Sequence, residues 1–144
     1  MATLWRALRR DRRGTAAIEF ALVLTVFLPL LFAIIAFGFR LATRIALSYA
    51  VAEGGRAAVA ALSPAERSTL ADAAVTRVLT SFSPLIDPAK AAISITDQGP
   101  TAEGEAILVA VSYQDSRFAV FPFLPDLAAV QTVQTTYLAG DPLG

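Results

Sequence analysis

The chain has 144 residues, enough for one small domain and a membrane segment but too few for two full domains. Apolar residues make up 56% of the sequence and the mean hydropathy is +0.59, both of which are high for a soluble protein. There is no cysteine and no histidine, which excludes disulfides, thiolate metal sites and imidazole catalysis. We therefore expect no enzyme and no cofactor, although carboxylate chemistry stays open on this ground alone.

Charge is unevenly distributed along the chain, although the formal net charge is zero. Residues 1–13 carry five arginines and one aspartate, whereas residues 41–144 carry six basic and ten acidic side chains. Such sorting is typical of a chain that crosses a membrane with its basic end in the cytoplasm. Because this leader is the only basic cluster, we expect no binding to nucleic acid.

A stretch of 20 residues without a charge, Phe20–Phe39, predicts a single transmembrane helix. A helix of this length spans about 30 Å, the thickness of a bilayer's hydrocarbon core. A buried core helix is the weaker alternative, because so short a chain has little material to surround one. Pro29 predicts a kink near Thr25–Pro29, where the Thr25 hydroxyl can bond a local carbonyl. The arginine excess before the span places the N-terminus in the cytoplasm and the rest outside.

A cleaved secretory signal is the main alternative for this segment, because such signals also begin with a basic stretch. Ala36–Gly38 loosely resembles a small-residue cleavage site. The apolar run is longer, however, than the roughly 7–15 residues of a signal. Cleavage there would also cut what the pattern indicates is one continuous helix.

Residues 40–62 predict a helix that continues beyond the membrane, with apolar residues mostly three or four positions apart from Leu41 to Leu62. Gly54 and Gly55 each weaken a helix by about 1 kcal/mol relative to alanine, which predicts a bend. Small residues also recur at every fourth position, and such a row lets another helix approach closely. They are Gly38, Ala42, Ala46, Ala50, Gly54 and Ala58.

Residues 63–144 predict a small α+β domain. Ser63-Pro64-Ala65-Glu66 has the pattern of a helix start with a capping box, and the helix would run to about Phe82. Its predicted buried face consists of Leu70, Ala74, Val78 and Phe82.

After Asp87-Pro88 the hydrophobic pattern changes to alternation. Strands are predicted over residues 91–96, 106–114 and 129–138, with a turn at 98–104. We expect a three-stranded antiparallel sheet with the 64–82 helix on one face. So small a core should need contacts with the long helix or with a partner.

Two groups of side chains in the predicted loops have functional potential. Phe118, Phe121 and Phe123 precede the last strand and either cover an edge of the sheet, the commoner outcome, or form a docking surface. The acids around the turn could form a cation or carboxylate site, but solvated turn acids are far commoner. They are Asp97, Glu103 and Glu105.

Immediately before the span, Arg12–Phe20 reads RRGTAAIEF. A carboxylate is costly inside hydrocarbon, so a place for Glu19 in the headgroup region is the simplest reading of that residue alone. A basic leader, a glycine, a glutamate five positions later and a long apolar helix together resemble the class III signal of type IV pilin-like proteins. This resemblance implies cleavage between Gly14 and Thr15 by a prepilin peptidase, and pairing of Glu19 with a neighbouring subunit or a basic partner.

Over most of its length the chain resembles TadE-like proteins of the tight-adherence (Tad/Flp) pilus system. The resemblance is strongest over residues 9–58, through Arg9–Leu22 (RRDRRGTAAIEFAL) and Ala52–Ala58 (AEGGRAA). Val109–Tyr113 and Phe121–Pro125 are weaker points of similarity. The doubled glycine is a departure, because the family commonly has one glycine before this arginine.

The resemblance implies a pseudopilin, or minor pilin-like subunit, in the bacterial inner membrane. It would have a cytoplasmic leader (1–14), a single-pass extended helix (15–62) and a periplasmic domain (63–144). Its implied partners are membrane lipid, a prepilin peptidase, other pilin-like subunits and the Tad secretion machinery. The alternative function is a secreted, or an unprocessed membrane-anchored, periplasmic binding module.

Overall fold

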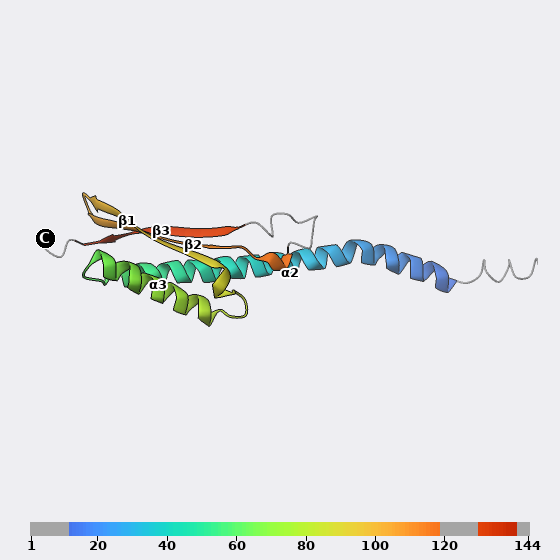
Figure 1. The fold of residues 1–144 in the computed structure, drawn as a ribbon. Helices are drawn as coiled ribbons and strands as arrows, with labels where there is room; N and C mark the ends of the chain where they lie inside the picture. The colour runs from blue at the N-terminus through green and yellow to red at the C-terminus, as the bar shows by residue number, and fades with distance from the viewer. Residues whose placement is uncertain (1–11, 119–129, 141–144) are drawn as a thin grey trace, which may run out of the picture. The chain divides into compact units, whose positions relative to one another are not determined.

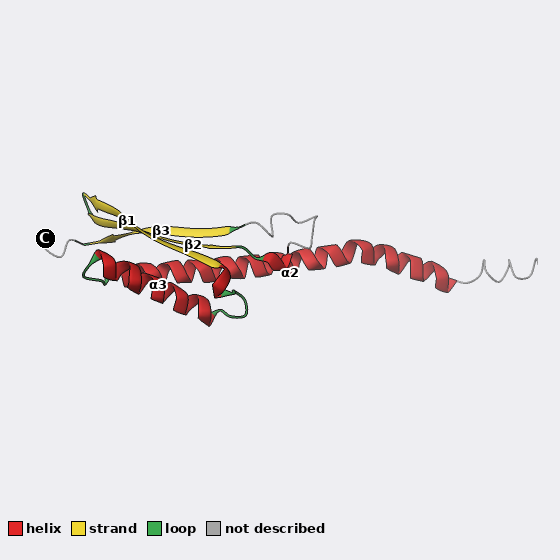
Figure 2. Cartoon of the chain, viewed as in Figure 1, coloured by secondary structure: helices red, strands yellow, loops and turns green. Residues whose placement is uncertain are grey.

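The computed structural model describes residues 12–118 and 130–140. In these ranges the chain forms α2 (Arg12–Val59), α3 (Pro64–Ser81), η1 (Pro88–Lys90), β1 (Ala91–Thr101), β2 (Gly104–Tyr113), η2 (Ser116–Phe118) and β3 (Gln131–Ala139), where η marks a 3-10 helix (Figures 1 and 2). The chain divides into two compact units, residues 1–36 and 37–144. The predicted α+β class is confirmed: a long N-terminal apolar helix precedes a second helix and a three-stranded antiparallel sheet.

The helix α2 contains 48 residues and continues through Pro29. As expected from the sequence, the Thr25 hydroxyl donates a hydrogen bond to a carbonyl one turn earlier, that of Ala21, at 2.8 Å. The helix also continues through Gly54 and Gly55 to Val59. The glycine pair therefore does not end the helix.

The predicted capping sequence starts α3. The Ser63 hydroxyl accepts a hydrogen bond from the Glu66 amide at 3.3 Å, and the Glu66 carboxylate accepts one from the Leu62 amide at 3.1 Å. In a capping box the Glu66 carboxylate would accept from the Ser63 amide; here it accepts from the amide one residue earlier.

The buried face of α3 is rotated from the predicted one. Leu70 is 40% exposed, whereas Ala71, Val75 and Leu79 are fully buried. Alanines occur on both of the faces that could be buried, so the hydrophobic period does not distinguish them. The prediction from this period is therefore wrong by one residue position along the helix. Of the other predicted positions, Ala74 is buried, and Val78 and Phe82 pack at the edge of the core.

The sheet is an antiparallel meander in the order β1-β2-β3. Ile95 pairs with Val109, and Val111 pairs with Val133, so apolar residues line one face across all three strands. The strands β1 and β2 are longer than predicted. A β-bulge between Asp97 and Gly99, with Gly99 at φ +83°, lets pairing continue almost to the chain reversal.

The helix α3 and the α2 residues after Phe37 pack on the apolar face of the sheet (Figure 1). The long helix therefore completes the small core, as the sequence suggested. The fully buried side chains of this core include Leu47 and Val51 of α2, Val75 and Leu79 of α3, and Ile107, Val109 and Val111 of β2.

The glycine pair lies where α2 meets this core. A Cβ atom on Gly54 would lie 2.6 Å from Cγ2 of Val75, and one on Gly55 would overlap the ring of Tyr137. The Tyr137 hydroxyl donates to the Val51 carbonyl at 3.3 Å, which holds that ring against the helix. The two glycines are thus explained by close packing.

Candidate membrane helix and contact surfaces

The apolar stretch of α2 exposes its side chains. Apart from the half-buried Leu24, the large apolar residues between Ile18 and Ile35 are 38–72% exposed, including Phe20 at 65% and Val26 at 72%. A core helix would bury such residues, so the core-helix alternative does not hold. By length and composition, this is the one helix among the described residues that could cross a membrane, which indicates a membrane anchor.

The residues of the predicted cleavage motif lie at the start of α2. The helix begins at Arg12, so the Gly14–Thr15 bond falls within its first turn. A Cβ atom on Gly14 would have no neighbour within 4 Å, and both Thr15 and Glu19 are exposed. The motif is therefore accessible to another protein. Its cleavage and the pairing of Glu19 stay predictions.

The row of small residues is mostly occupied within the chain. Ala46 and Ala50 are fully buried, and Gly54 is covered by Val75 of α3 and Val109 of β2. The close approach that these residues allow is thus made by the protein's own α3 and sheet. Gly38 is open, with nothing within 4 Å of a Cβ atom, and Ala42 is half-buried. A contact between this row and another subunit stays a prediction.

An exposed apolar stripe lies on the face of α2 next to this row. Leu41, Ile45 and Tyr49 stand four residues apart and are 52%, 49% and 63% exposed; we call these three residues the outer stripe. The ring of Tyr49 stacks on that of Phe82, with centroids 6.4 Å apart. Shallow grooves follow the stripe towards α3. The sequence showed the spacing of these residues but not which face they occupy.

A buried arginine on α3 was missed from the sequence. Arg67 is 6% exposed; its guanidinium pairs with the Glu105 carboxylate, and Asp97 lies 3.8 Å away. Two of the predicted turn acids are therefore held by an ion pair, and they do not form a cation site. The signal that could have found Arg67 is its place one turn before Ala71, on the true buried face. Within the described ranges no cluster of acidic side chains fits a metal ion.

A second buried charge, Asp115, also escaped sequence reasoning. Asp115 is 3% exposed, and its two carboxylate oxygens accept hydrogen bonds from the Arg117 guanidinium at 2.8 and 2.6 Å. Burial tends to raise the pKa of Asp115, but the hydrogen bonds and charge of Arg117 outweigh it and lower this pKa. Arg117 also donates to the Leu85 carbonyl at 2.8 Å and lies 5.5 Å from the ring centre of Phe39. This pair joins the end of β2 to the segment after α3 and to α2.

The predicted phenylalanine docking surface is not placed by the structure. Phe121 and Phe123 lie outside the described residues, and of Phe118 only the backbone, at the end of η2, is described.

Residues 14–56 match the family model described as TadE-like protein, which confirms the resemblance over this part of the chain. The matched region begins at Gly14, contains the whole apolar stretch and the outer stripe, and ends at Arg56 after the glycine pair. No curated protein and no solved structure matches the chain significantly.

Proposed function

From the TadE-like match of residues 14–56, which indicates a protein associated with the Tad pilus, we propose that the chain is a pseudopilin-like subunit in pilus assembly. Its helix would be held in the bacterial inner membrane, with the N-terminus in the cytoplasm and the domain in the periplasm. The observation that carries this proposal is the exposed apolar surface of α2 inside the matched region. Exposed apolar side chains over about 20 residues need either lipid or apolar partner helices. Its role is structural, acting through helix packing.

The helix packing that we propose has two parts. In the membrane, the side chains from Phe20 to Phe39 contact lipid and the spans of other pilin-like subunits. Beyond it, the outer stripe continues the apolar contact, because Leu41 follows the span after a single residue. Buried small residues such as Ala50 let α2 pack closely against its own sheet, and this packing holds the outer stripe in place.

Removal of the leader is the step that we propose to prepare the helix for assembly. Cutting between Gly14 and Thr15 by a prepilin peptidase removes all five N-terminal arginines and leaves a new amino group on Thr15, four residues before Glu19. Because the bond lies in the first helical turn, the peptidase must unwind that turn. A glycine lowers the cost of unwinding by about 1 kcal/mol relative to alanine. Glu19 then provides the charge for pairing with a neighbouring subunit, or with a basic partner, at the membrane edge.

N-terminal sequencing of the mature protein from its host tests the processing step. A mature chain that starts at Thr15 supports the proposal, and Gly14→Leu should then block maturation. Gly38→Leu is the matched control, because Gly38 is equally open but lies outside the motif. A start at Phe39 would support a cleaved secretory signal, and an intact Met1 would support the unprocessed membrane-anchored binding module.

Cysteine cross-linking tests the packing step, because the chain has no native cysteine. A single cysteine at Ile45 should form a disulfide with single cysteines placed in co-expressed pilin-like subunits of the host. A cysteine at Arg56, exposed but off the outer stripe, is the control and should cross-link weakly. In the same assay Glu19→Ala should reduce cross-linking without reducing membrane insertion, whereas Glu53→Ala should not. Equal cross-linking at the two cysteines would contradict packing through the outer stripe.

A further inference from the structure

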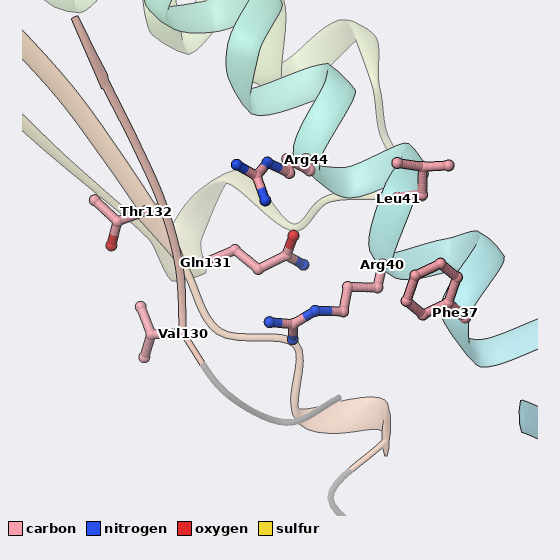
Figure 3. Close-up of a pocket in the computed structure, with 7 residues that line it drawn as sticks. All are labelled: Phe37, Arg40, Leu41, Arg44, Val130, Gln131 and Thr132. Atoms are coloured by element: carbon pink, nitrogen blue, oxygen red, sulfur yellow. The ribbon is translucent and has the colours of Figure 1, made fainter. Parts of the chain in front are cut away.

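A cavity of about 310 Å³ lies between α2, just past the apolar stretch, and the start of β3 (Figure 3). Two of the side chains that line it are arginines one helical turn apart, Arg40 and Arg44. None of the described lining residues is acidic. The full lining is Phe37, Arg40, Leu41, Arg44, Val130, Gln131 and Thr132.

The amide of Gln131 is held inside this cavity. Gln131 is 8% exposed, and its side chain lines the cavity. Figure 3 shows the amide group between the guanidinium groups of Arg40 and Arg44. Gln131 is the first residue of β3 and pairs with Tyr113, so the sheet fixes its position. A buried amide costs free energy unless its hydrogen-bonding groups are satisfied. The amide of Gln131 faces the cavity, so water or a polar ligand held there can satisfy it.

The charge in the cavity fits an anion. Arg40 already has an interaction within the chain, so Arg44 is the main cation available to a ligand. Its guanidinium forms no ion pair with any carboxylate in the described ranges. Guanidinium groups match the geometry of phosphate oxygens, and an amide N–H adds a directed donor.

We propose that this cavity binds the phosphate of a membrane phospholipid headgroup, with Arg44 and Arg40 as the cations and the Gln131 amide as a hydrogen-bond donor. A lipid is favoured over free phosphate by the position of the arginines along α2. At the helical rise they lie about 1.5 and 7.5 Å beyond Phe39, within the depth of the headgroup layer. Phe37 and Leu41 add apolar walls suited to the glycerol and the first acyl carbons. The inference rests on the membrane anchor and is independent of the pilus role.

Binding can be measured on the full chain in dodecyl maltoside, a detergent without phosphate. The probes are short-chain phosphatidylglycerol and inorganic phosphate, each titrated and followed by phosphorus NMR and calorimetry. We expect the lipid to bind more tightly than inorganic phosphate. Arg44→Gln should weaken lipid binding about tenfold, the size expected for the loss of one charge-assisted hydrogen bond. Gln131→Leu should weaken it about threefold, as expected for a neutral donor.

Arg56→Gln is the matched control, because Arg56 is an exposed arginine on the same helix outside the cavity. It should leave lipid binding unchanged. Equal losses for Arg44→Gln and Arg56→Gln would overturn the proposal in favour of diffuse attraction to positive charge. Equal binding of inorganic phosphate and lipid would overturn the lipid assignment. Arg44 is exposed, so its variant should fold even if Gln131→Leu does not. The assay uses purified protein, so its failure is distinguishable from failure of the pilus proposal.

Discussion

The two parts of α2 sort their side chains in opposite ways. Up to Ile35, large apolar side chains such as Phe20 are exposed, and no charge follows Glu19 until Arg40. Further along the same helix Leu47 and Val51 are fully buried. The domain to which they belong even buries charged groups, Arg67 and Asp115, each beside an opposite charge.

This contrast indicates what surrounds each part. In water, most charged side chains are exposed, and the few that are buried are paired, as Arg67 and Asp115 are in the domain. An exposed surface that is apolar and free of charge fits a hydrocarbon medium, in which the backbone bonds of a helix are all satisfied internally. The same helix therefore serves as an anchor over one part and as a core element over the other.

The largest expected effect comes from truncating a core residue of α2. Leu47→Ala should lower the free energy of unfolding of the domain by about 3 kcal/mol, because it leaves a cavity in a fully packed core. The measurement is thermal unfolding of the full chain in detergent. Ile45→Ala, two residues away on the outer stripe, should change stability by less than about 0.5 kcal/mol. Equal losses would mean that the buried and exposed faces of this part of α2 are not distinct.

The next largest effect is expected from substituting two glycines of α2, one in close-packed and one in open surroundings. Gly54→Leu should lower the free energy of unfolding by about 2 kcal/mol, because the new side chain meets Val75 and Val109 in a close-packed region. Gly38→Leu should be neutral or slightly stabilising, because its surroundings are open and leucine favours the helix. Circular dichroism on heating would compare them. A neutral Gly54→Leu would show that α2 and α3 can separate at little cost.

The sequence predicted most of the fold because its strongest signals are local. The uncharged run Phe20–Phe39, the capping pattern at Ser63 and the alternation through Val109 each identify an element from its own residues. The predictions that were wrong concern how two elements pack or pair with each other. The face of α3 and the length of the β1–β2 pairing depend on which residues meet across the core. Propensity and period do not contain that information.

The candidate site shows the same limit. Gly14 and Glu19 could be singled out because their spacing to the span is a property of the chain alone. No pattern in the sequence brings Gln131 near Arg44, because 86 residues lie between them. The small-residue row illustrates the reverse case: its spacing is genuine, but the residues that approach Gly54 belong to this chain.

A smaller effect tests the buried charge of the domain. Arg67→Met should cost about 1–2 kcal/mol of unfolding free energy, less than breaking a fully buried pair, because the Glu105 and Asp97 side chains are 41% exposed and can be hydrated. Urea unfolding of both proteins would measure it. Arg77→Met is the control on the same helix, since Arg77 is exposed and its loss should change little. A stabilised Arg67→Met would show that the desolvation of Arg67 outweighs its ion pairs.

The smallest expected effect is a dependence on acid. The pKa of Asp115 is lower in the folded protein than its ordinary value of 3.8, so the stability that its carboxylate contributes is fully present above that value. It is lost as the pH falls through the lowered pKa, that is, below about pH 4. Asp115→Asn should cost about 1 kcal/mol at neutral pH, through weaker hydrogen bonds with Arg117, and should flatten this acid loss.

Melting temperatures between pH 2 and 7 would measure the difference, with Asp72→Asn on the exposed face of α3 as the control. The control should keep the wild-type acid loss, because the Asp115–Arg117 pair is intact in it. An unchanged acid loss in Asp115→Asn would mean that this pair does not hold the carboxylate in its charged form. The burial of Asp115 would then not be explained by pairing with Arg117. Only Arg67 would remain as an example of a paired buried charge in the domain, in contrast to the charge-free stretch of α2.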